Sequence, residues 1–162
     1  MNLGKNKIAV IGHTRGIGKA ICDLYKKKKY EVVGMSKSNG FDIIHDQEKI
    51  IENIEDCGLV VLNAHADRGQ LNILKRIYGQ HLFSKMKVVV ITSTSGTEED
   101  PDYNQFKVWD KFKYVQYCQI KKELIEYINE LQQELIFKPL SVYDVCPDVV
   151  DTDMTKGLWE DL

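Results

Sequence analysis

Apolar residues, most of them valine and isoleucine, gather in five short runs along the chain. The runs span residues 7–11, 31–35, 59–62, 88–91 and 140–145. Runs in which β-branched residues follow one another, with few polar residues between them, are typical of strands that are buried on both faces. Because strands of a parallel sheet are buried in this way, the pattern predicts a parallel sheet.

Between these runs, apolar residues recur at helical spacing instead. Residues 17–24, 50–54, 71–82 and 117–135 each carry such an apolar stripe. Strand and helix therefore alternate along the chain, which predicts a doubly wound parallel α/β sheet, a minimal Rossmann fold, with right-handed crossovers. The expected strand order is 3-2-1-4-5-6, with a short extended piece at residues 41–43 and no full crossover helix before it.

The composition restricts the class of protein. The 162 residues are 43% hydrophobic and 28% charged, which is typical of a globular chain, so residues 1–162 are interpreted as a single domain. The 22 lysines and arginines nearly balance 24 aspartates and glutamates, and this balance argues against a nucleic-acid or membrane surface. The 4 cysteines are scattered without a CxxC pair, and the N-terminus has no signal-peptide pattern. We therefore expect a cytoplasmic protein with reduced thiols and no metal site.

A glycine-rich turn connects the first predicted strand to the first predicted helix. Gly12 allows a sharp turn, Gly16 allows a pyrophosphate to approach the backbone, and Gly18 allows the helix and the strand to pack closely. The helix N-terminus adds unpaired N–H groups and the positive end of its dipole. Glycines also serve ordinary turns and caps, but their place between a strand and a helix favours a dinucleotide phosphate site.

The spacing of this turn, GxxxGxG with Thr14-Arg15-Gly16-Ile17-Gly18, resembles the fingerprint of the short-chain dehydrogenase/reductase family. The resemblance implies a nicotinamide cofactor. Arg15 matches a basic position of NADP-preferring members, and Ser36-Lys37-Ser38 follows the second strand where NAD enzymes carry an acid. We therefore expect NADP(H) in preference to NAD(H), although Lys37 could also be a solvated turn residue. Asp42 resembles the family aspartate that reaches the adenine amino group.

Three further segments extend the resemblance along the chain. Asn63 and Ala64 match half of the family's Asn-Asn-Ala-Gly turn, in which His65 replaces the glycine. Ser93 lies three residues before a glycine, as the family's catalytic serine does. The segment with Pro147, Val150 and Thr152 resembles the Pro-Gly-x-Val-x-Thr segment that lies against the nicotinamide, with Asp148 in place of the glycine.

The family's catalytic pair has the pattern Tyr-x-x-x-Lys, which this chain contains three times. The pairs are Tyr25/Lys29, Tyr103/Lys107 and Tyr117/Lys121. Only Tyr117 begins a long amphipathic segment, and Lys121 lies one helical turn after it on the same face. The resemblance therefore implies Ser93, Tyr117 and Lys121 as catalytic residues, and Tyr117 and Lys121 also as contacts of the cofactor.

The resemblance implies hydride transfer between NADP(H) and a small carbonyl or alcohol substrate, with Tyr117 as the acid or base. It also implies a homodimer or homotetramer, through the helices near 70–83 and 114–135, where Ile73, Phe83, Ile120 and Tyr127 lie off the main apolar stripe. The chain ends soon after Thr152, so we expect a domain without the family's C-terminal substrate lid. Two alternatives stay open: an NADP(H)-binding sensor or interaction module with little turnover, and a flavin or mononucleotide binder.

Overall fold

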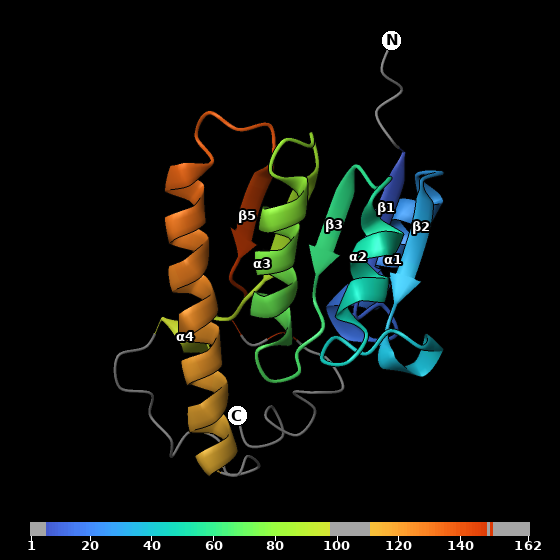
Figure 1. The fold of residues 1–162 in the computed structure, drawn as a ribbon. Coiled ribbons are helices and arrows are strands. Elements are labelled where there is room, and N and C mark those ends of the chain that lie inside the picture. The colour runs from blue at the N-terminus through green and yellow to red at the C-terminus, as the bar shows by residue number, and fades with distance from the viewer. Residues whose placement is uncertain (1–5, 98–110, 149, 151–162) are drawn as a thin grey trace.

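The computed structural model describes residues 6–97, 111–148 and 150, which form a parallel sheet flanked by helices (Figure 1). The strands are β1 (Lys7–Ile11), β2 (Glu31–Met35), β3 (Leu59–Leu62), β4 (Lys87–Ile91) and β5 (Ser141–Val145). Their order is β2-β1-β3-β4-β5, and every paired neighbour is parallel. All five apolar runs are therefore strands, and their carboxyl ends lie at one edge of the sheet.

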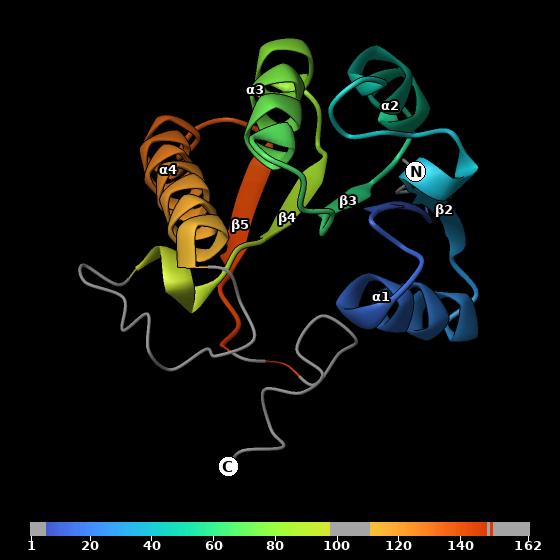
Figure 2. The same cartoon turned by 90° about the horizontal axis from the view of Figure 1, so that it is seen from below.

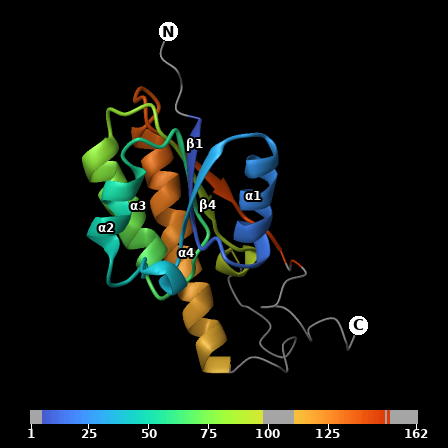
Figure 3. The same ribbon diagram turned by 90° about the vertical axis from the view of Figure 1, so that its right-hand side faces the viewer.

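The helices divide unequally between the two faces of the sheet. They are α1 (Gly16–Lys27), α2 (Gln47–Ile54), α3 (Gly69–His81) and α4 (Lys111–Glu134). Figures 2 and 3 show α1 on one face and α2, α3 and α4 on the other. This two-sided arrangement confirms the doubly wound α/β class. None of the described helices has a stretch long and apolar enough to cross a membrane.

The prediction of an extended piece at residues 41–43 is wrong, because this segment leads into a turn and does not join the sheet. The Asp42 carboxylate accepts a hydrogen bond from the backbone N–H of Ile44 at 2.8 Å, and the Asp42 N–H donates to the Asp46 carboxylate at 2.7 Å. Such local side-chain bonds give the backbone partners that a strand ladder would otherwise supply. Without its third strand, the expected order 3-2-1-4-5-6 reduces to the observed 2-1-3-4-5.

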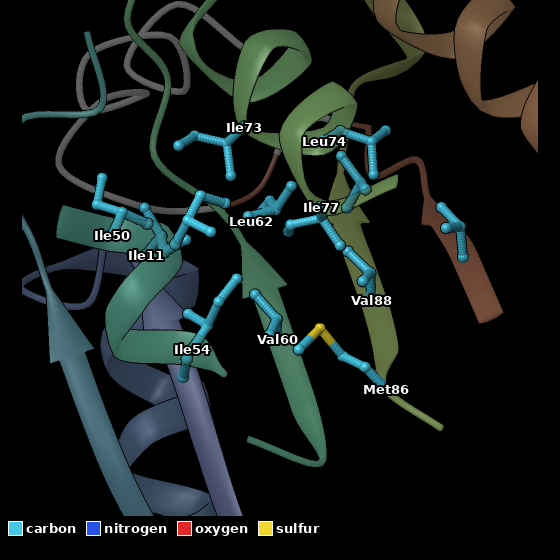
Figure 4. Packing of buried hydrophobic residues seen from close by; sticks show 14 of the residues in the cluster. Ile11, Ile50, Ile54, Val60, Leu62, Ile73, Leu74, Ile77, Met86 and Val88 are labelled. Carbon is cyan, nitrogen blue, oxygen red and sulfur yellow. The ribbon is translucent and has the colours of Figure 1, made fainter. Parts of the chain in front are cut away.

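The larger part of the core lies between the sheet and α2, α3 and α4. Figure 4 shows isoleucines of α2 and α3 over the strands, with side chains that are fully buried. The labelled members are Ile11, Ile50, Ile54, Val60, Leu62, Ile73, Leu74, Ile77, Met86 and Val88. A smaller cluster, which includes Ile8, Val10 and Cys22, lies under α1.

Two of the four residues for which we expected a contact with another subunit are buried within the single chain. Ile73 is 0% exposed and Ile120 is 6% exposed, so neither needs another subunit to cover it. Tyr127 is partly buried against the main core, whereas Phe83, after α3, is 79% exposed. Of these four residues, only Phe83 is therefore exposed for contact with another subunit.

The glycine turn is packed so closely that two of its glycines have no room for a side chain. A Cβ atom on Gly12, whose φ is +91°, would lie 2.5 Å from the backbone N of Ala64. A Cβ atom on Gly18 would lie 2.0 Å from the carbonyl oxygen of Gly12. That same oxygen accepts a hydrogen bond from the Asn63 side chain at 2.9 Å. The turn, the start of α1 and the end of β3 are thus fixed together by backbone contacts.

We predict that Gly18→Ala lowers the free energy of unfolding by about 2 kcal/mol or more, because the new methyl group meets backbone that cannot move aside cheaply. The control is Gly79→Ala on α3, where an added Cβ has no neighbour within 4 Å. That variant should raise stability by roughly 0.5–1 kcal/mol through helix propensity. Urea denaturation measures both, and equal effects of the two substitutions would contradict the packing described here.

Candidate active site

The carboxyl edge of the sheet brings together segments that are far apart in the sequence. Gly12 follows β1, Asn63 follows β3, Ser93 follows β4 and Pro147 follows β5. Ligands of open α/β sheets bind outside this edge, where crossovers leave in opposite directions. Here that point lies between β1, whose crossover leads to β2, and β3. Because β3 separates β1 from β4, the glycine turn and the serine segment lie about 10 Å apart.

The start of α1 leaves its backbone N–H groups without a side-chain cap. Arg15 occupies the N-cap position with φ −153° and ψ 170°, and its side chain makes no capping hydrogen bond. Gly16 follows with φ +53°, in the left-handed region that favours glycine. Thr14 and Arg15 are exposed, whereas Ile17 packs on the cluster under α1. Uncapped N–H groups at a helix start, with an adjacent guanidinium, form a suitable place for phosphate.

Two residues expected at the nucleotide contact each other. Nζ of Lys37 lies 3.2 Å from the Asp42 carboxylate. The backbone N–H of Ile44, and then Lys37, hold the pKa of Asp42 below its usual value. Ser36 and Ser38 share a hydrogen bond at 2.9 Å beside this pair. Arg15, in contrast, has no acidic partner among the described residues, so its charge is the more available of the two cations.

The serine segment docks directly on the helix that carries Tyr117 and Lys121. A short 3₁₀ turn, η2 (Thr94–Gly96), follows Ser93. A Cβ atom on Gly96 would lie 2.8 Å from the backbone carbonyl carbon of Lys121, so only glycine allows this approach. Docking brings the Ser93 hydroxyl within hydrogen-bonding reach of the Tyr117 side chain. Burial raises the pKa of Tyr117, and the contact with Ser93 opposes that change.

Lys121 is a buried cation, with 2% of its surface exposed. Its ammonium donates to the side-chain oxygen of Gln70 at 2.7 Å and to the carbonyl oxygen of Ile91 at 3.2 Å. Burial lowers the pKa of Lys121 to about 8, although the charge of Asp144 acts in the opposite direction. Nζ of Lys121 also lies 5.6 Å from the centre of the Tyr117 ring. The described site therefore has a phenol beside a buried ammonium.

Sequence reasoning missed Gln70, although the sequence contains a signal for it. Gln70 precedes Leu74 by four residues and Ile77 by seven, so it lies on the buried stripe of α3. It is 3% exposed, and a polar residue at such a position requires partners inside the protein. The resemblance offered Asn72 as the only candidate for the asparagine with which the family supports its catalytic residues. Gln70, on the same helix, is the residue that contacts Lys121.

His65 also contacts Tyr117. The two ring centres are 4.8 Å apart and the rings meet edge to face, at 77°. His65 as a whole is exposed, but protein packed around its ring lowers its pKa to about 4, with a further contribution from the Lys121 charge. The imidazole is therefore neutral near pH 7, and its ring takes up space where the family has a glycine.

Hydrogen bonds join the ends of β4 and β5 beyond the sheet. Thr92 donates through its hydroxyl to the Asp144 carboxylate at 2.6 Å, and the backbone N–H of Thr94 donates to the carbonyl oxygen of Pro147 at 3.1 Å. Pro147 therefore lies beside the serine segment. Val150 is exposed, and Thr152 lies outside the described residues.

The sequence matches no protein-family model, and a search of curated proteins found no match either. Solved structures do resemble the fold. A short-chain dehydrogenase/reductase from Vibrio parahaemolyticus superposes with a TM-score of 0.70 at 16% identity, over 86% of this chain and 75% of the other. A short chain dehydrogenase from Burkholderia cenocepacia in complex with NADP gives 0.70 at 15% identity, over 93% and 75%.

A third structure, the 3-alpha-hydroxysteroid dehydrogenase from a Pseudomonas species complexed with NADH, gives a TM-score of 0.68 at 15% identity, over 91% and 74% of the two chains. At these identities, the likeness is one of fold. The chain therefore has the fold of short-chain dehydrogenase/reductase structures.

We predict that the buried charge of Lys121 makes stability depend on pH. In the unfolded chain its pKa returns to the ordinary value near 10.5, above the folded value of about 8. Between these values the unfolded chain holds more protons, so the free energy of unfolding rises with pH, by about 2 kcal/mol from pH 8 to 10. The difference between wild type and Lys121→Met in urea denaturation isolates this effect. If the difference in the free energy of unfolding between the two proteins did not change with pH, burial would not destabilise the charged form of Lys121.

Proposed function

We propose that this protein is an NADP(H)-dependent oxidoreductase that interconverts a small carbonyl compound and its alcohol. One observation carries the proposal: Ser93, Tyr117 and Lys121 converge at the carboxyl edge of the sheet. The same edge carries an uncapped helix start after a glycine turn, separated from Ser93 by a single strand. This arrangement supports a site in which one dinucleotide reaches from the glycine turn to Tyr117.

The residues at this edge suit a nicotinamide dinucleotide. The start of α1 with Gly16 would hold the pyrophosphate, and Arg15 would reach a 2′-phosphate. Asn63 and Ala64 would border the adenosine. Lys121 uses two of its three N–H donors on described residues, which leaves one for the nicotinamide ribose. Pro147, Val150 and Thr152 would lie beside the nicotinamide, which, when bound, supplies the hydride chemistry.

Tyr117 would act as the general acid in carbonyl reduction. Burial raises its pKa, so the phenol keeps its proton near pH 7 and can give it to the carbonyl oxygen. Ser93 would donate a hydrogen bond to that oxygen as negative charge develops there. The ammonium of Lys121 would favour the phenolate that the proton transfer leaves behind. The contacts of Tyr117 with Ser93 and Lys121 support these three roles.

Two observations favour the alternative functions. The ring of His65 narrows the space beside Tyr117, which favours a protein that binds NADP(H) and turns over slowly or not at all. The strand order 2-1-3-4-5 is also that of flavodoxin-like mononucleotide binders. FMN is therefore a third candidate ligand, beside NADPH and NADH.

We predict that NADPH binds more tightly than NADH or FMN, and that Tyr117→Phe lowers kcat by about 10²–10⁴-fold on any carbonyl the wild type reduces. Cofactor fluorescence measures binding, and loss of NADPH absorbance measures turnover on a panel of aldehydes and ketones. Tyr25→Phe is the matched control, because Tyr25 on α1 begins another Tyr-x-x-x-Lys pair, whose lysine, Lys29, lies beyond the end of the helix.

Tight NADPH binding without turnover in wild type would favour the sensor. Preferential FMN binding would favour the mononucleotide binder, and no binding of any nucleotide would refute all three hypotheses.

We also predict that Arg15→Ala raises the Kd for NADPH by about 10–100-fold, since it removes a charge-assisted contact with the 2′-phosphate. The Kd for NADH, which lacks this phosphate, should change little. Lys37→Ala should have the smaller effect, because Asp42 already pairs with Lys37. An equal loss of affinity for both nucleotides in Arg15→Ala would show that Arg15 does not determine the choice of cofactor.

A further inference from the structure

Gln70 is the only glutamine among the described residues that is buried. Both the NH₂ group and the oxygen of its side chain make hydrogen bonds. Its NH₂ group donates to the carbonyl oxygen of Leu62 at 2.8 Å and to that of Ile91 at 3.0 Å. Its side-chain oxygen accepts from Nζ of Lys121 at 2.7 Å. These partners fix the orientation of the amide, because a flipped amide would place oxygen against two carbonyls and NH₂ against an ammonium.

The three partners of Gln70 come from three different elements. Leu62 is the last residue of β3, Ile91 is the last residue of β4, and Lys121 is on α4. Ile91 O also accepts from Lys121 itself, which closes the set of hydrogen bonds. One side chain on the first turn of α3 thus fixes the lysine relative to both central strand ends.

Gln70 is a neutral acceptor for a buried cation, and this choice has an electrostatic consequence. The charged or titratable groups around Lys121 are Asp144 on β5, Cys146 after it, Tyr117 on α4 and His65 after β3. Among the described residues, no carboxylate forms an ion pair with Lys121, and the Asp144 carboxylate accepts from Thr92. A glutamate at position 70 would place a negative charge within hydrogen-bonding distance of the Lys121 ammonium and neutralise it.

We propose that Gln70 is a positioning residue, which holds the Lys121 ammonium at the ends of β3 and β4 and leaves its charge acting on the Tyr117 hydroxyl. The part that concerns Tyr117 rests on the proposed function, in which these two residues handle the proton. The part that concerns Lys121 is a property of the protein alone, and it is measured without substrate or cofactor.

The test is the titration of Lys121 in two variants that act in opposite directions. The probe is ¹³C-labelled lysine observed by NMR, with the Lys121 signal assigned by its absence in Lys121→Met. The wild-type midpoint should lie at about 8. Gln70→Glu should raise it by at least one pH unit, because a carboxylate now faces the ammonium. Gln70→Asn should lower it, since the shorter amide cannot reach Lys121 and both strand carbonyls.

The matched controls are Gln132→Glu and Gln132→Asn. Gln132 is on α4, as Lys121 is, and like Gln70 it donates to a strand carbonyl, that of Val142 at 3.1 Å, but it lies about three helical turns from Lys121. Neither control should move the Lys121 midpoint. Circular dichroism establishes that each variant is folded, and either Gln70 variant alone gives a decisive direction if the other fails to fold.

Turnover then separates this proposal from the proposed function. We expect Gln70→Glu to lower kcat by about tenfold with little change in KM, because neutralising Lys121 removes its support for the Tyr117 phenolate. An unchanged Lys121 midpoint in both Gln70 variants overturns the positioning role, whatever the turnover. Shifted midpoints with undiminished kcat overturn its link to Tyr117. Shifted midpoints in a protein that reduces no carbonyl overturn the proposed function and leave Gln70 as the residue that holds Lys121.

Discussion

The parallel direction of the strands is the constraint on which the site depends. Every described strand pair is parallel, so the segments that follow the strands emerge at one edge. Residues as distant in sequence as Gly12 and Pro147 share that edge for this reason alone. Close backbone contacts then set their spacing, with Gly18 against Gly12 on one side and Gly96 against Lys121 on the other. The direction of the strands determines which residues lie at this edge. The glycines, which have no side chain, allow the segments to approach one another closely.

The strands and helices could be predicted because burial is visible in the sequence. Runs of valine and isoleucine identified all five strands, and apolar stripes identified the four helices. The prediction of an extended piece at residues 41–43 failed because Ile43 is buried, at 4% exposure, as a strand residue would be. Hydrophobic pattern reports burial and not the backbone's hydrogen-bond partners, and here the Asp42 side chain supplies a partner. For the same reason Ile73 and Ile120 suggested an interface, although this chain buries them itself.

The positions of the site residues could be inferred, but their partners could not. The family resemblance singled out Ser93, Tyr117 and Lys121, and strand ends and helix register indicated that they lie near the edge. The ion pair between Lys37 and Asp42 and the contact of His65 with Tyr117 depend on side-chain geometry that no spacing encodes. Gln70 is the clearest case, because its partner on α4 is 51 residues away in sequence. Only its place on a buried helical stripe indicates that it needs partners.

The burial of Lys121 is better explained by the proposed function than by stability. An ammonium enclosed by neutral acceptors loses hydration, and the lowered pKa of Lys121, about 8, expresses that loss. A methionine of similar length would pack against the same sheet without this cost. The nearby Asp144 could offset the cost through an ion pair, but its carboxylate accepts from Thr92 instead. The fold thus holds the Lys121 cation beside Tyr117, while the Asp144 carboxylate, which could neutralise Lys121, bonds to Thr92. That separation destabilises the protein, and it is what the proposed role of Tyr117 as a proton donor requires.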